Sequence, residues 1–153
     1  MKKILLISAV STALLLFITP VIATEESVVS GHKIVIDAGH GGTDPGSTAC
    51  EGLYEKDANI DIAYRLKILL EEKGAVVYLT RKDDETLNNS QRYDYANSTD
   101  GEVLVSIHLN GAYDDRDGTI GLYSKPNKDK EFTRVVHESL VSSLVPGNVS
   151  EKE

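Results

Sequence analysis

Short apolar runs alternate with longer amphipathic stretches over most of this chain. The runs are rich in Val, Ile and Leu and are bounded by Gly, Pro, Asn or Asp, a pattern typical of strands that are covered on both faces. They predict four strands, at residues 34–36, 75–80, 103–108 and 119–124.

Helical spacing appears in the stretches between and after these runs. A first helix is predicted from Glu55 onward, with Gly74 standing where a C-terminal cap belongs. A second is predicted at residues 87–96, and a third follows the break at Pro126 and Asn127. The apolar face predicted for the first helix comprises Ile62, Ala63, Leu66, Leu69 and Leu70. The corresponding face of the third comprises Phe132, Val135, Val136, Leu140 and Leu144.

This order of elements predicts an α/β fold with an open, mostly parallel twisted sheet and helices on both faces. The second run begins directly after Gly74, so we expect the first two strands to be parallel and joined by a strand–helix–strand crossover. Ligands bind such sheets outside the carboxyl ends of the strands. His40 and His108 both fall at such ends.

The N-terminal segment has the character of a secretory signal. Lys2 and Lys3 precede a long apolar stretch, and Val21 and Ala23 form a small-residue cleavage pattern. We therefore predict a signal peptide over residues 1–23, a short linker over residues 24–31 and one domain over residues 32–153. An uncleaved membrane anchor is the alternative, because the apolar stretch is near spanning length; Pro20 favours cleavage.

The net charge disfavours some classes of binding partner, and the single cysteine disfavours a disulfide-stabilised fold. The chain carries a formal net charge of -8, and removal of two lysines with the signal would leave 14 basic against 24 acidic residues, a net charge of -10. This charge opposes binding to nucleic acid or to anionic lipid. Cys50 stands alone, so no intramolecular disulfide is expected; Cys50 as a metal ligand is a less favoured alternative to the histidines.

Three segments carry candidate chemistry. His40 lies among glycines in IVIDAGHGGTDPG, Glu55 opens a helix in GLYEKDANIDIA, and His108 ends VLVSIHLN. Two imidazoles and a carboxylate suit a zinc ion that keeps one position open for water. The plainer interpretations are hydrogen-bonded structural histidines, which we expect for His32 and His137, and for Glu55 a favourable interaction with the helix dipole.

These segments resemble the zinc-dependent N-acetylmuramoyl-L-alanine amidases of the family 3 type, which cut peptidoglycan. The resemblance begins at about His32 and does not reach the family's C-terminal part, so we expect an amidase catalytic domain that lacks this part. It implies that His40, Glu55 and His108 bind Zn²⁺. It also implies hydrolysis of the amide bond between N-acetylmuramic acid and L-alanine in peptidoglycan or muropeptides. An exported chain, in the cell envelope, the cell wall or the medium, fits this substrate.

The same resemblance leaves the general base unassigned. In the family it is a glutamate in a segment resembling Leu-Val-Glu-x-Gly-Phe, which this sequence does not contain, so no catalytic acid–base residue is identified. Asp37 either orients a ligand imidazole from behind or is simply the polar end of a strand. Arg81, Arg92 and Asn97 match recurrent family positions and are expected to be structural.

Other function classes fit less well. No Gly-x-Ser-x-Gly sequence supports a serine hydrolase, and no phosphate-binding glycine pattern supports a nucleotide enzyme. The serious alternative is an inactive zinc- or glycan-binding remnant of an amidase. We expect the 153-residue chain to bind zinc and to release little or no stem peptide. Its oligomeric state stays open, with an uncovered sheet edge favouring association.

Overall fold

The computed structural model describes residues 27–48, 52–109, 119–125 and 128–144. The predicted signal peptide, Cys50, Glu151 and Glu153 lie outside these residues. The elements in chain order are β1 (Lys33–Ala38), α1 (Glu55–Glu72), β2 (Val76–Leu79), α2 (Asn89–Ser98), β3 (Val103–Ile107) and α3 (Asp129–Leu144).

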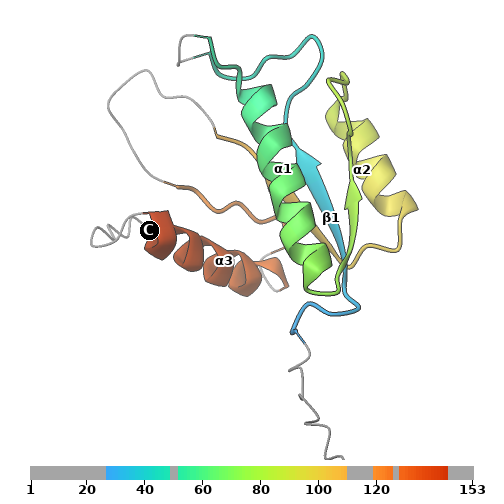
Figure 1. Ribbon diagram of the computed structural model, residues 1–153, viewed down its shortest axis with the longest axis vertical. Coiled ribbons are helices and arrows are strands. Elements are labelled where there is room, and N and C mark those ends of the chain that lie inside the picture. Colours follow the sequence, from blue (N-terminus) through green and yellow to red (C-terminus); the bar gives the residue numbers. More distant parts are fainter. Residues whose placement is uncertain (1–26, 49–51, 110–118, 126–127, 145–153) are drawn as a thin grey trace, which may run out of the picture.

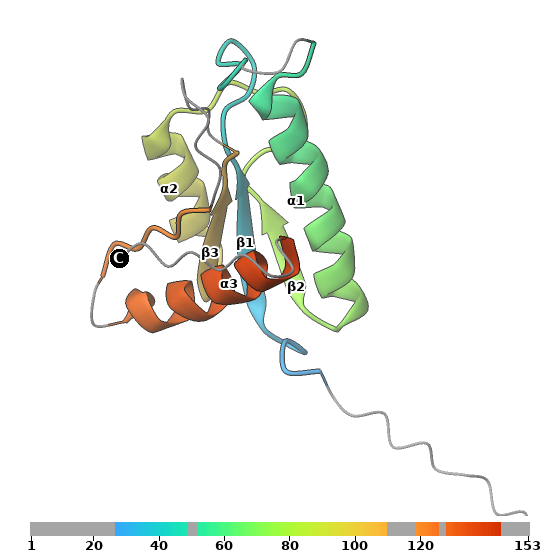
Figure 2. The ribbon, with the colours of Figure 1, turned by 90° about the vertical axis from the view of Figure 1, so that its left-hand side faces the viewer.

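The three strands form one parallel sheet in the order β2-β1-β3. In its register, Ile36 of β1 lies opposite Leu79 of β2 and Val105 of β3. Figures 1 and 2 show α1 and α2 on opposite sides of the strands, with α3 beyond the β3 edge. The predicted open α/β sheet with helices on both faces is confirmed.

This strand order has a consequence for ligand binding. The chain passes from β1 to β2 on one side and then crosses back to β3 on the other, so the order reverses at β1. Open α/β sheets bind ligands outside the carboxyl ends of the strands at such a switch point. The α1 helix begins at this same end of the sheet, as Figure 1 shows. The fold thus brings the end of β1, the end of β3 and the start of α1 together.

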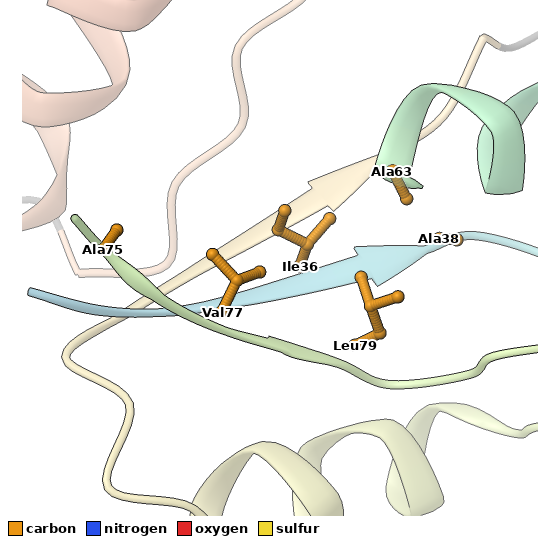
Figure 3. Packing of buried hydrophobic residues seen from close by; sticks show 6 residues of the cluster. All are labelled: Ile36, Ala38, Ala63, Ala75, Val77 and Leu79. Carbon is orange, nitrogen blue, oxygen red and sulfur yellow. The ribbon is translucent and has the colours of Figure 1, made fainter. Parts of the chain in front are cut away.

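The hydrophobic core lies between the sheet and α1. Ile36 and Ala63 are fully buried, and the alternate residues Val77 and Leu79 of β2 face the same cluster. In Figure 3, Ala63 points from α1 toward the strands. Because its side chain is a single methyl group, the helix can pack closely over β1.

The inward face of α1 differs in part from the predicted one. Ala63 is buried and Leu66 and Leu70 pack against the core, but Ile62 is 36% and Leu69 55% exposed. Successive residues of a helix differ by about 100° around its axis, so Ile62 lies well away from the line through Ala63 that contacts the sheet. The prediction was wrong for these two residues.

The predicted fourth strand was also wrong. Residues 119–125 form no strand, and Thr119 instead contacts α3, where Nε2 of His137 lies 2.9 Å from both its hydroxyl and its carbonyl oxygen. α3 itself buries none of its residues. Its apolar residues are 43% to 61% exposed: Phe132, Val135, Val136, Leu140 and Leu144. None of the helices in the described part of the chain combines the length and apolar character that crossing a membrane requires.

Candidate metal centre

His40 lies in a tight loop directly after β1. Its φ is 60°, in the left-handed region that a non-glycine residue adopts only with strain. Gly41 and Gly42 also have positive φ, and Gly41 pairs with Asp44 across the turn. The loop therefore reverses at the two glycines, so that the imidazole of His40 is presented at the end of the strand.

Two further glycines leave room for the site. A Cβ atom on Gly39 would lie 2.3 Å from the imidazole of His108. A Cβ atom on Gly46 would lie 2.6 Å from the His40 ring and 2.8 Å from Cβ of Glu55. All three distances are far below van der Waals contact, so glycine at these positions is what allows the two imidazoles and the carboxylate to approach the backbone.

Glu55 is the first residue of α1 and the most deeply buried member of the group. Its side chain is 3% exposed. Oε1 accepts a hydrogen bond from the backbone N–H of Leu109 at 2.9 Å, and Oε2 accepts one from the N–H of Ser47 at 2.8 Å. The carboxylate is thereby fixed between the loop that follows β1 and the segment that follows β3.

The three predicted ligands converge at this point. Nε2 of His40 and Nδ1 of His108 lie 3.1 Å apart, and each lies 3.3 Å from Oε1 of Glu55. Two donor atoms at ~2.0–2.1 Å from one tetrahedral zinc ion would be separated by roughly 3.3 Å. Among the residues that the structure describes, these three are the His, Cys, Asp or Glu side chains that lie close enough together, as a set of at least three, to hold a metal ion.

The group is open on one side. The His108 side chain is 40% exposed and that of His40 22%, against 3% for Glu55. The imidazole planes are nearly perpendicular, at 81°, with their centroids 4.7 Å apart. Solvent therefore reaches the group from the side of the two imidazoles, while the carboxylate is the buried member; access of this kind is what a catalytic metal site requires.

Asp44 orients His40. Its Oδ2 lies 2.8 Å from Nδ1 of His40, which leaves Nε2 directed at the centre of the group. The hydrogen bond to His40, followed by one from the backbone N–H of Gly46, holds the pKa of Asp44 below its ordinary value. A carboxylate behind a ligand imidazole fixes its orientation and its tautomer.

Asp37, for which the sequence left open either this role or a simple polar strand end, makes other contacts. Its carboxylate receives hydrogen bonds from Thr80, Ser106 and Arg92 and touches neither imidazole. Burial opposes ionisation of Asp37, but these three donors outweigh it and keep its pKa below the ordinary value. Alternate side chains of a strand face opposite sides, so Asp37 lies on the α2 face of the sheet, away from the core residues Ile36 and Ala38. The turn at Gly41 and Gly42, in contrast, carries Asp44 back to His40.

The remaining histidines make ordinary hydrogen bonds, as predicted. His32 Nδ1 lies 2.6 Å from Oε2 of Glu102, and His137 contacts Thr119. Three contacts at the group were not predicted from sequence, those of Asp44, Ser47 and Leu109. The contact of Asp44 with His40 depends on how the loop turns at Gly41 and Gly42, which the sequence pattern does not specify. The backbone donors at Ser47 and Leu109 leave no mark in the sequence.

Comparison with known proteins identifies the family of the chain. Residues 34–151 match the family model described as N-acetylmuramoyl-L-alanine amidase, Amidase_3. The chain belongs to this family. It is 40% identical over 115 residues to the sporulation-specific N-acetylmuramoyl-L-alanine amidase of Bacillus subtilis, covering 74% of this chain and 43% of that relative.

Solved amidase structures share the fold. The catalytic domain of CwlV from Paenibacillus polymyxa matches with a TM-score of 0.65 and 35% identity, over 70% of this chain and 61% of that one. The CwlD amidase of Clostridioides difficile, solved in complex with the GerS lipoprotein, matches with a TM-score of 0.66 and 32% identity, over 79% and 71%. The chain spans between about a fifth and three fifths of the length of the curated relatives it matches.

The requirement for glycine at position 46 can be tested with Gly52 as a matched control. Gly46 and Gly52 both have positive φ, but a Cβ atom on Gly52 would meet nothing within 4 Å. Gly46→Ala and Gly52→Ala should each cost about 1–2 kcal/mol of unfolding free energy from left-handed strain. Only Gly46→Ala should also shift the imidazole NMR signals of His40. Unchanged His40 signals in that variant would show that the loop does not need glycine there.

Proposed function

We propose that this amidase-family chain is a metal-dependent hydrolase of the amide bond between N-acetylmuramic acid and L-alanine in peptidoglycan. His40, Glu55 and His108 would hold one zinc ion. The observation that carries the proposal is the convergence of two imidazole nitrogens and a buried carboxylate oxygen, 3.1 Å to 3.3 Å apart, at the switch point of the sheet. Family membership supports the choice of reaction.

The donor set fits zinc better than the harder divalent ions. Imidazole and carboxylate together suit zinc, whereas magnesium and calcium prefer an all-oxygen set. Three protein donors with one open side leave a place for water or substrate. When bound, zinc would supply Lewis-acid activation of water and of the scissile carbonyl.

The residues of the chain prepare this site in distinct ways. Asp44 holds Nδ1 of His40, so that the lone pair of Nε2 faces the metal position. The N–H groups of Ser47 and Leu109 fix the Glu55 carboxylate. The exposed flank of His108 leaves an approach for a muropeptide amide.

In this proposal none of the described residues is assigned as the general acid or base. The carboxylates hydrogen-bonded at the group are those of Glu55 and Asp44, and both are engaged in holding it. The alternative function is zinc or glycan binding without hydrolysis. The two differ in whether stem peptide is released.

The test compares the chain with a version extended by the C-terminal segment of a related amidase. Muropeptides are supplied with zinc, and release of stem peptide is followed by chromatography and mass spectrometry. The extended protein should cleave the amide bond, and the 153-residue chain should be slower by about 10² to 10⁴, the usual effect of losing a general acid or base.

His108→Ala in the extended protein is the control for metal dependence and should abolish release. If the extended protein releases no stem peptide, the proposed reaction is wrong. If the unextended chain cleaves at a similar rate, a residue already present acts as the base, and the alternative of a binding protein is excluded.

We also propose that the protein is exported and acts at the cell envelope or cell wall, because the N-terminus has the basic, apolar and small-residue order of a signal peptide. The exported chain should begin at Thr24, which N-terminal sequencing of material from the medium or wall would reveal. Recovery of chains that still begin at Met1 and need detergent for release would indicate an anchor instead.

A further inference from the structure

The backbone that carries His40 is held by two buried arginines from outside the metal group. The carbonyl oxygens of Ala38, Gly39 and His40 all accept hydrogen bonds from guanidinium groups. Arg81 follows β2 and Arg92 lies on α2; they are 2% and 7% exposed. A loop with three successive carbonyls turned inward needs such donors, because buried carbonyls without partners are costly.

Arg92 is the arginine that reaches His40 itself. Its Nη2 donates to the carbonyl oxygen of His40 at 2.8 Å and to that of Leu87 at 3.2 Å. Its Nη1 donates to the carbonyl oxygen of Ala38 at 2.9 Å and to Oδ1 of Asp37 at 2.7 Å. The planar guanidinium therefore joins α2 to both ends of the short segment that leads from β1 into the site.

Asp37 anchors this guanidinium to the sheet. Thr80, just after β2, donates to its Oδ1 at 2.5 Å, and Ser106 of β3 donates to its Oδ2 at 2.7 Å. The carboxylate is thus held from both neighbouring strands, and its side chain is 7% exposed. Arg92 is consequently fixed relative to all three strands and not only to its own helix.

The conformation of His40 is where this support acts. A non-glycine residue in the left-handed region is strained and persists only when its surroundings hold it there. The peptide carbonyl of His40 is held by Arg92, while its ring is held by Asp44. Rotation of that peptide would move Nε2 out of line with Glu55 and His108.

We propose that Arg92, anchored by Asp37, is a positioning residue for the metal ligand His40: it holds the backbone of His40 in the left-handed conformation that aims Nε2 at the metal position. This inference rests on the proposed metal site. Arg81 holds the preceding peptide through the carbonyl of Gly39, and its other described hydrogen bonds reach Ala38, Lys56 and Asp83. Arg92 differs from it in reaching the carbonyl of His40 itself. The Asp37 side chain acts on His40 through Arg92, one step removed.

The test is Arg92→Lys, which keeps the positive charge and removes the fork of donors. Zinc affinity is measured by competition with a chelator, and the geometry of the site by the visible absorption of the Co²⁺ form. The variant should bind zinc about ten- to hundredfold more weakly, as is usual when support behind a ligand is lost, and its Co²⁺ spectrum should change.

Val77→Ala is the matched control for stability. Val77 is buried in the hydrophobic core, and its apolar side chain cannot hydrogen-bond to Asp37 or Arg92. Its truncation should therefore weaken the fold and leave zinc affinity within about twofold of the wild type. A purely structural role for Arg92 would make zinc affinity follow stability in both variants, and that result would overturn the proposal. Wild-type affinity and an unchanged spectrum in Arg92→Lys would also overturn it.

Asp37→Asn decides the matter if Arg92→Lys does not fold. It keeps the size of the side chain and leaves Arg92 in place without its carboxylate, so weaker zinc binding is expected, and unchanged binding would contradict the anchoring role. Failure of the wild-type chain to bind zinc would be a different result, because it would remove the proposed metal site and this inference with it.

Discussion

Burial of the Glu55 carboxylate is the constraint on which the rest of the site depends. A carboxylate removed from water costs several kcal/mol unless charges and hydrogen-bond donors compensate it. Here the N–H groups of Ser47 and Leu109 donate to it, and the imidazoles of His40 and His108 lie 3.3 Å from Oε1. Because these partners follow β1 and β3, satisfying one buried anion brings the three segments of the site to one place.

The buried face of α1 contributes both to the site and to the hydrophobic core. Glu55, Asn59 and Ala63 are its buried residues, each four positions after the last. Ala63 packs in the hydrophobic core, and the amide of Asn59 donates to the carbonyl oxygen of Gly39 at 3.2 Å. Core packing of a regular helix therefore sets the position and rotation of the Glu55 carboxylate, to which the two loop-borne imidazoles are then fitted.

Much of this was predictable from sequence, for identifiable reasons. The three strands and three helices followed from short apolar runs and helical spacing, and the donors His40, Glu55 and His108 followed from residue type, glycine context and family resemblance. Which aspartate contacts His40 was not predictable in this way, because it depends on how the chain turns at Gly41 and Gly42. Likewise, residues 119–124 have a strand-like sequence pattern but form no strand, and Thr119 contacts α3 instead.

The central claim is that His40, Glu55 and His108 together hold a metal ion, and the other two described histidines provide matched controls for it. Zinc bound per chain is measured after equilibrium dialysis for the wild type, His40→Ala, His108→Ala, His32→Ala and His137→Ala. The account predicts about one zinc in the wild type and in the two control variants, and at least a roughly tenfold loss in the other two. Full occupancy in His40→Ala or His108→Ala, or an equal loss in His32→Ala, would contradict it.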